Sequence, residues 1–210
     1  MVRTRSDDKR REIIRVAAEA FQELGFERTS MLTIAERMRG SKQTLYNYFR
    51  SKEELLRAVL AFDVGEVADQ ALNELRAEKS LRKGLARLGE VYLARQLAPL
   101  AISNIRNVAT QPAESGVGED FYQNILCTAW KRVADAFKEL MAQGKLVRAD
   151  PWLAAMHFKG LALQDLLERQ LLNAVKRTSH KEVEAAAKHA ADAFLKIYGN
   201  DQAKTKRALP

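Results

Sequence analysis

The helical spacing of the apolar residues is the feature that most constrains the fold of this chain. From about residue 9 to residue 199, apolar side chains recur three and four positions apart, which places them on one face of a helix. The sequence shows no sustained alternation of β-branched residues and no Asn-Gly or Asp-Gly turn, so strand signals are missing. Proline, which interrupts helices, occurs only four times in 210 residues. The sequence therefore predicts an all-α fold.

The first three expected helices are short and share one small core. A helix over 9–24 comes first, Ser30 is placed to cap a second, and Ser41 caps a third after the turn at Arg39 and Gly40. Further helices are expected over 51–79 with a bend, 81–97, 99–110, 121–143, 151–174 and 179–198.

Two signals set boundaries in the rest of the chain. Residues 111–120, QPAESGVGED, are expected to form a loop. Ser51 with Glu54, and Ser179 with Glu182, have the spacing of capping boxes at helix starts.

Positive charge is concentrated at the N-terminal end. Residues 1–52 hold twelve basic and seven acidic residues, a net charge of +5 out of +8 for the whole chain. Such a charge favours a polyanionic partner, although ordinary basic globular proteins also carry it. The N-terminal quarter is therefore the part to search for an anion-binding surface.

The cysteine and histidine content excludes several classes of site. Cys127 is the only cysteine, so the chain has no intrachain disulfide framework and no thiol cluster for zinc. Three scattered histidines do not make a multi-ligand metal site. No apolar run approaches the eighteen or so residues of a membrane span. We expect a soluble cytoplasmic protein with no metal, no cofactor and no membrane association.

The segment 41–55, SKQTLYNYFRSKEEL, is unusual for a helix that only faces water. If Leu45 and Phe49 face the core, then Gln43, Tyr46 and Asn47 share the opposite face. Amide side chains can make paired hydrogen bonds to adenine in the major groove, whereas hydroxyl and basic groups suit phosphate oxygens. The pattern indicates a helix-turn-helix motif over about 30–49, and the alternative is a solvated helix face in a bundle.

Residues 13–59 closely resemble the N-terminal DNA-binding domain of the tetracycline-repressor (TetR) family; they read IIRVAAEAFQELGFERTSMLTIAERMRGSKQTLYNYFRSKEELLRAV. The matching positions are the Ala-rich first helix ending in Phe21, the GFERTS turn, the IA of the second helix, Ser41, Thr44-Leu45-Tyr46, Tyr48-Phe49 and Ser51-Lys52-Glu53.

The resemblance implies a set of DNA contacts and an assembly. Side chains implied to lie in or beside the major groove are Lys42, Gln43, Thr44, Tyr46, Asn47 and Tyr48. Those implied to hold phosphates are Ser30, Ser41 and Lys52. Members of the family are usually homodimers that bind double-stranded operator DNA. A small-molecule effector in the C-terminal helices usually shifts the DNA-binding heads apart and releases the operator.

The turn before the third helix departs from the family pattern. Where the family usually reads Ala-Gly-Val-Ser, this chain reads Met-Arg-Gly-Ser over 38–41, and Gln43 stands where glycine is common. A non-glycine residue at positive φ costs about 1 kcal/mol, so either Arg39 or Gly40 takes that position. Gln43 adds a base-reading side chain that glycine cannot supply.

The C-terminal helices carry weaker signals. Aromatic and polar side chains that are candidates for an effector pocket are Phe121, Tyr122, Trp130, Trp152, His157 and Phe158, with ordinary core as the alternative for the aromatic ones. The Ala-rich last two helices fit a dimer bundle as well as a monomer core. The resemblance favours the dimer, with candidate interface residues Phe158, Leu161, Val183, Phe194 and Ile197.

We therefore expect two domains: a DNA-binding domain over 7–67 and a helical effector-binding and dimerisation domain over 68–200, followed by a frayed tail, 201–210. The predicted function is a non-catalytic, effector-released repressor. A TetR-like protein that acts through a protein partner or in chromosome organisation is the alternative. An α-helical enzyme is disfavoured because no nucleophile and base signature, Gly-rich phosphate loop or metal cluster occurs.

Overall fold

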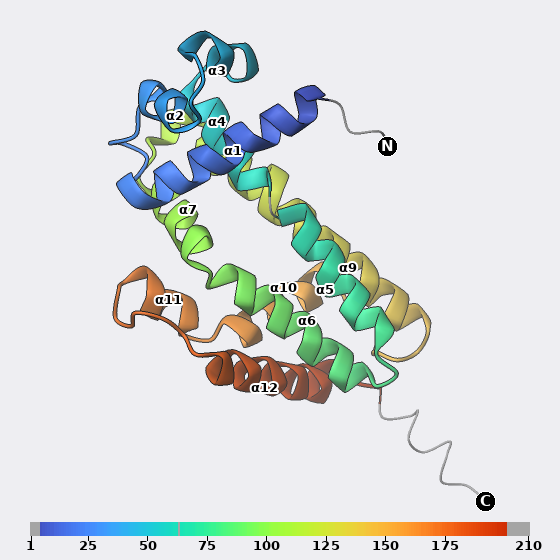
Figure 1. The fold of residues 1–210 in the computed structure, drawn as a ribbon. Helices are drawn as coiled ribbons and strands as arrows, with labels where there is room; N and C mark the ends of the chain where they lie inside the picture. The colour runs from blue at the N-terminus through green and yellow to red at the C-terminus, as the bar shows by residue number, and fades with distance from the viewer. Residues whose placement is uncertain (1–4, 63, 201–210) are drawn as a thin grey trace, which may run out of the picture. The chain divides into compact units, whose positions relative to one another are not determined.

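The computed structural model describes residues 5–62 and 64–200, and the predicted tail lies outside them. Over these residues the chain is helical and no strand is formed, which confirms the all-α class. The helices are α1 (Arg5–Leu24), α2 (Met31–Arg37), α3 (Lys42–Tyr48), α4 (Lys52–Phe62), α5 (Val64–Ala77), α6 (Leu81–Gln96), α7 (Pro99–Ala109), α8 (Val117–Asp120), α9 (Cys127–Ala142), α10 (Pro151–Leu163), α11 (Leu166–Leu171) and α12 (His180–Tyr198) (Figure 1). None of the helices so described is long and apolar enough to span a bilayer.

The chain folds into two compact units that do not follow its order. The first unit comprises the described residues up to Val64 together with Ala98–Leu126. The second comprises Gly65–Leu97 together with the described residues from Cys127 onward. Helices α7 and α8 therefore belong to the unit that contains the predicted DNA-binding helices, although they follow α6 in the sequence.

The core of the first unit has the composition that the apolar spacing predicts. Ile13, Ala17 and Phe21 form the buried face of α1, and Leu45 and Phe49 are the inward residues of the α3 region. Helix α1 packs against α4 and α7, so the short α2 and α3 are held on a larger support. Helices of seven residues are not stable alone in water, and this packing is what maintains them.

Both short helices begin at a capping serine, as predicted. The Ser30 Oγ accepts a hydrogen bond from the Thr33 backbone N–H at 3.0 Å, and the Ser41 Oγ accepts one from Thr44 at 2.9 Å. Both serines have extended backbone conformations, which is the usual geometry of an N-cap. Local sequence therefore fixes where α2 and α3 start.

The turn between α2 and α3 places Arg39, not Gly40, at positive φ. Arg39 has a φ of 50°, its N–H donates to the Glu36 carbonyl, and the Gly40 N–H donates to the Ala35 carbonyl. These two bonds form a Schellman motif, in which the left-handed position is usually glycine. Gly40 has its own constraint, because an added Cβ would lie 3.0 Å from the Met38 Cε.

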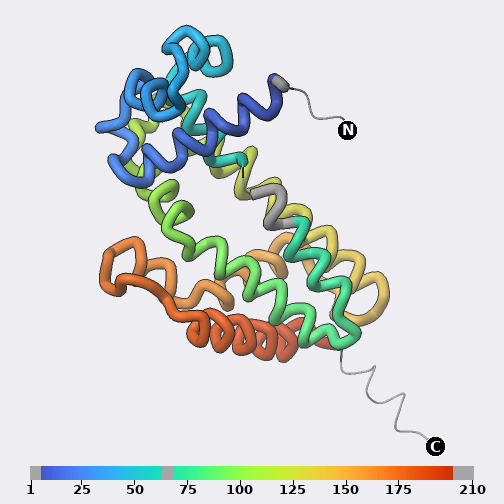
Figure 2. Tube along the Cα trace, in the orientation of Figure 1, coloured from blue at the N-terminus to red at the C-terminus, as the bar shows by residue number. Residues whose placement is uncertain are grey.

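The second unit is built on α6, α10 and α12, with α9 packed against α10. Helices α6 and α12 lie side by side (Figure 2), and a Cβ on Gly89 would lie only 3.1 Å from the Ala187 Cβ. Three rings fill the centre: Phe137 lies 5.9 Å from Phe158 and 5.0 Å from Phe194, measured between ring centroids. Small residues permit the close approach of the helices, and the phenylalanines are large apolar side chains in the centre of the core.

Helix boundaries between α7 and α9 differ from the prediction. The expected loop over 111–120 contains a 3-10 turn (η1, Ala113–Ser115) and α8, because Val117 is fully buried and holds this segment against the first core. The expected helix over 121–143 begins with a π-helical turn (η2, Phe121–Leu126) before α9.

The predicted helix over 151–174 is broken near its middle. Gln164 has φ 47° and ψ −131°, which no helix can accommodate, and α11 starts after it. Leu166 and Gln170 are buried after the break, so packing of α11 determines where the chain turns. Side-chain type alone gives no sign of this, because glutamine is a good helix former.

The helix expected over 51–79 corresponds to α4 and α5, and residue 63 between them lies outside the described residues. The Ser51 Oγ accepts a hydrogen bond from the Glu54 N–H as expected, but the Glu54 carboxylate accepts one from the Arg50 N–H. The capping box at the start of α12 is complete and confirms the prediction there.

The strained turn gives a stability prediction. Arg39→Gly should raise the free energy of unfolding by up to about 1 kcal/mol, because glycine adopts positive φ without strain and the exposed arginine loses little packing. Gly25→Ala is the matched control: Gly25 has a φ of 80° and open space around an added Cβ, so this variant should lose about 1 kcal/mol through strain alone. Urea unfolding followed by circular dichroism measures both, and a loss in Arg39→Gly would contradict the assignment.

Candidate DNA-binding site

The exposed face of α3 carries the side chains that the sequence places there. Leu45 is fully buried, whereas Gln43, Tyr46 and Asn47 are exposed. The predicted division of α3 into an inward apolar face and an outward polar face is therefore confirmed. Two amides and a phenol on one exposed face provide hydrogen-bond donors and acceptors of the kind that read base edges.

The two amides on this face are bonded to each other. The Gln43 Nε2 donates a hydrogen bond to the Asn47 Oδ1 at 3.1 Å. This bond leaves the Gln43 carbonyl oxygen and the Asn47 amino group available to a partner. The pair therefore presents one acceptor and one donor group in a held orientation, which matches the acceptor and donor that adenine shows in the major groove.

Hydroxyl and basic groups surround the amide pair. The Ser41 and Thr44 hydroxyls lie 2.8 Å apart, so each is already in a hydrogen bond while Ser41 stays exposed. The Lys42 Nζ lies 5.6 Å from the centroid of the Tyr46 ring, within the range of a cation–π contact. Ser30, at the start of α2, is likewise exposed and bonded to the Thr33 hydroxyl.

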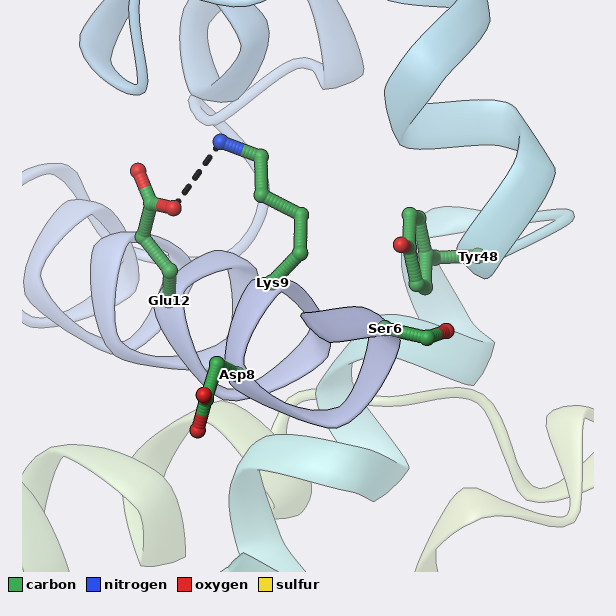
Figure 3. Close-up of a pocket in the computed structure, with 5 residues that line it drawn as sticks. All are labelled: Ser6, Asp8, Lys9, Glu12 and Tyr48. Atoms are coloured by element: carbon green, nitrogen blue, oxygen red, sulfur yellow. Dashed lines mark hydrogen bonds and ion pairs between the residues drawn. The ribbon is translucent and has the colours of Figure 1, made fainter. Parts of the chain in front are cut away.

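Tyr48 lies at the edge of this surface. It is half-buried, and its ring borders an open hollow that Ser6, Asp8, Lys9 and Glu12 of α1 also line (Figure 3). The Lys9 Nζ is bonded to the Glu12 carboxylate at 2.9 Å and is therefore partly neutralised. Tyr48 thus packs beside the start of α1, away from the most exposed part of α3.

Lys52 has a structural role that the sequence did not reveal. Its Nζ donates to the Phe26 carbonyl at 2.8 Å and to the Glu27 carbonyl at 3.5 Å, and it lies 4.1 Å from the centroid of the Phe26 ring. The ammonium therefore ties α4 to the turn after α1. Its assignment to a DNA phosphate stays a prediction, which would use the remaining donor of the ammonium.

Arg10 is a basic group that the sequence analysis did not single out. Its exposed guanidinium lies over the Phe49 ring at 5.1 Å, next to the end of α3. The sequence signal was the basic run KRR over 9–11 in an otherwise amphipathic helix. Arg10 therefore places a positive charge next to the end of α3.

The residues predicted for an effector pocket are divided between the two units. In the first unit, Phe121 is half-buried against the core and Tyr122 is exposed. In the second unit, Trp130 and Phe158 are buried and Trp152 is half-buried. The remaining candidate is His157, whose Nδ1 is hydrogen-bonded to the Tyr198 hydroxyl at 2.7 Å.

The predicted interface residues need correction. Phe158 and Phe194 are fully buried inside the subunit and Val183 is buried with them, so they form its core and are not available to a partner. Leu161 is half-buried, and only Ile197, at 57% exposure, presents a large apolar surface. The error arises because apolar residues on an inward helix face and on an interface face recur with the same spacing. The spacing alone therefore does not tell which face meets a partner.

Comparison with known proteins identifies both parts of the chain. Residues 13–59 match the family model of bacterial regulatory proteins of the tetR family. Residues 83–200, more than half of the chain, match the model of the AefR-like transcriptional repressor C-terminal domain.

Similar proteins agree with these matches. A TetR-family transcriptional regulator from Mesorhizobium loti is 30% identical, with coverage of 94% of this chain and 100% of that chain and a TM-score of 0.85. The flavonoid-responsive regulator FrrA is 27% identical, with coverage of 91% and 97% and a TM-score of 0.66. The HTH-type transcriptional regulator YhgD of Bacillus subtilis, itself uncharacterized, is 23% identical over 154 residues, 71% of this chain and 78% of that protein.

The exposed amide face of a capped third helix, the basic N-terminal unit and these matches lead to one assignment. Members of the family are transcriptional regulators and not enzymes. The chain belongs to the TetR family and is a helix-turn-helix transcriptional regulator.

Proposed function

We propose that this regulator is a homodimeric repressor that binds double-stranded operator DNA and leaves it when a small-molecule effector binds. The exposed amide pair on α3 is the observation that supports the DNA-binding part of this proposal. A helix face that only contacts water does not need Gln43 and Asn47 to be held together by a hydrogen bond. The functional division is 7–67 for DNA binding and 68–200 for effector binding and dimerisation. The family models matched at 13–59 and 83–200 support this division.

The proposed DNA contacts follow the exposure of each side chain. Base reading rests on Gln43 and Asn47, with Lys42, Thr44 and Tyr46 beside them in the major groove. Ser30 and Ser41, exposed at the starts of α2 and α3, are assigned to phosphates. Tyr48 and Lys52 are assigned to the margin of the interface, because each already packs against another element of the first unit.

The proposed dimer uses the outward faces of α10 and α12. Leu153 and Ile197 are more than half exposed. The hydrogen bond between His157 of α10 and Tyr198 of α12 joins the parts of the two helices that carry these residues. Gly160 lies two turns after Leu153 with open space beside it, so another helix can approach closely there. The half-buried Leu161 keeps its place in this interface, whereas Phe158, Val183 and Phe194 support it from within.

The proposed effector site lies in the second unit. Its match to an AefR-like repressor C-terminal domain and the flavonoid response of the similar FrrA both support control by a small molecule. A DNA complex that withstands every small molecule tested would favour control through a protein partner.

The test of the DNA-binding proposal separates recognition of the base sequence from binding through charge alone. A duplex selected by the wild-type protein and a scrambled duplex are titrated at one salt concentration with wild type and Gln43→Ala. We expect a loss of about 1 to 3 kcal/mol on the selected duplex and little change on the scrambled one, since the amide reads bases and not phosphates. Equal losses on both duplexes would make Gln43 a positioning residue, and no selected duplex at all would refute the function.

Lys42 and Lys52 form a matched pair of lysines. Lys52→Met should lower the free energy of unfolding by about 1 to 2 kcal/mol, because two carbonyls lose a charged donor. Lys42→Met should leave stability nearly unchanged and reduce affinity for all duplexes, with a smaller slope of log affinity against log salt. Thermal unfolding and salt-dependent DNA titration distinguish the two, and an unchanged stability of Lys52→Met would contradict the observed contacts.

A charged substitution on the exposed apolar face of α10 and α12 tests the proposed dimer. Ile197→Glu should convert the protein to a monomer of 23.7 kDa in sedimentation, since the carboxylate would be buried at the interface. Leu172→Glu is the control, because Leu172 is 78% exposed but lies after α11, outside the proposed face. A wild-type monomer at micromolar concentration would refute the dimer. If both variants were monomers, the assignment of the interface to the outward faces of α10 and α12 would be refuted.

A further inference from the structure

Helix α2 carries an exposed leucine that the core of the first unit does not use. Met31, Ile34 and Ala35 form the buried face of α2, with the spacing expected of an amphipathic helix. Leu32 falls outside this spacing, and its side chain is 53% exposed. A single exposed apolar residue is ordinary on a protein surface, so its meaning depends on what surrounds it.

The contacts of α2 show which side of the helix Leu32 occupies. Helix α2 lies between α1 and α3 and packs against both (Figure 1). The Arg37 guanidinium donates a hydrogen bond to the Glu23 carboxylate of α1 at 2.7 Å, so one flank of α2 is turned toward α1. Leu32 precedes Arg37 by five residues, which corresponds to about 140° around a helix. Leu32 therefore lies on the flank turned away from Glu23, on the side of α3.

The position of Leu32 along α2 brings it next to the proposed DNA interface. Ser30 is the exposed cap of α2, and Leu32 belongs to the first turn that follows this cap. A duplex held by Ser30 and by the exposed face of α3 passes beside the first turn of α2. Leu32 is then the large apolar side chain that meets it.

The chemistry of this flank suits a base and not a phosphate. Glu36 lies one turn after Leu32 and is also exposed, so the flank has an acidic group that repels phosphates. Leucine itself has no donor or acceptor in its side chain, and it can form no hydrogen bond to a base edge. The C5 methyl group of thymine is the apolar group that base pairs display in the major groove.

We propose that Leu32 is a specificity-determining residue that packs against the methyl group of a thymine in the operator. Cytosine at the same place lacks the methyl group and presents an amino group, which leucine would leave without a partner. Leu32 thus adds an apolar selection of thymine on α2 to the hydrogen-bonding amides on α3. This inference rests on the proposed binding of operator DNA, and it specifies one feature of the sequence that is bound.

The test removes the methyl group from the DNA and the side chain from the protein. In the duplex selected by the wild-type protein, deoxyuridine replaces one thymine at a time, in both half-sites together. At one thymine position, wild type should lose about fourfold in affinity for each half-site, which is the effect of one methyl group leaving an apolar contact. Loss of the methyl group also alters base stacking, so the decisive quantity is the difference between wild type and variant in a double-mutant cycle.

Leu32→Ala should bind the unmodified duplex more weakly and lose nothing further from deoxyuridine at that one position. Leu32→Met should keep the response to deoxyuridine, because methionine retains an apolar side chain of similar size. Phe62→Ala is the matched control: Phe62, at the end of α4, is 43% exposed and has no assigned DNA contact, so this variant should respond like wild type.

Two measurements separate base reading from a structural or electrostatic role of Leu32. Circular dichroism and thermal unfolding of Leu32→Ala should match wild type, because the residue is exposed and alanine is the better helix former. The slope of log affinity against log salt should also be unchanged, since no phosphate contact is removed. A reduced slope would make Leu32 part of the phosphate-binding surface and would overturn the proposal.

The outcomes for Leu32 and for the proposed function are distinct. A selected duplex in which no thymine position responds to deoxyuridine, or in which every response survives in Leu32→Ala, would overturn the reading of thymine by Leu32 alone. In that case the test with Gln43→Ala still decides the function of α3. The absence of any selected duplex would instead defeat the proposed binding of operator DNA, and the inference on Leu32 with it.

Discussion

The backbone turn at Arg39 and Gly40 is the constraint on which the proposed DNA-reading surface depends. Helix α3 has seven residues and cannot maintain itself, so its direction is set by what precedes it and by what it buries. Two hydrogen bonds close the turn, the Ser41 cap starts the helix, and Leu45 anchors it in the core. The protein tolerates a strained Arg39 because these contacts together over-determine the backbone there.

The side chains on the exposed face of α3 are also ordered by a contact within the protein. Exposed glutamine and asparagine normally sample several rotamers, and ordering them on DNA costs conformational entropy. The bond from Gln43 to Asn47 restricts both amides before DNA arrives. The position at which this chain departs from the family pattern therefore bears on the proposed recognition of DNA, since a glycine at residue 43 could not form that bond.

Local signals made the N-terminal part predictable. Capping serines, an apolar face on α1 and the outward amides of α3 are each read from a few neighbouring residues, and the structure confirms them. Tertiary packing decided what the sequence could not show: the break at Gln164, the burial of Val117 within an expected loop, and the placement of Phe194 in the core. Lys52 belongs to the same class, because its carbonyl partners lie 25 and 26 residues earlier in the chain.

The two candidate sites differ in how visible they are in the sequence, and the reason is energetic. A DNA-reading face must be exposed and polar, so it stands out against an amphipathic helix pattern. An effector site inside a bundle must look like core, and the candidate residues Trp130 and Phe158 do so, because both are buried. A ligand shifts a conformational equilibrium only through its different affinity for the two states. The proposed release by a small molecule requires this difference in affinity, and packed side chains would provide it without any sequence pattern that separates them from ordinary core.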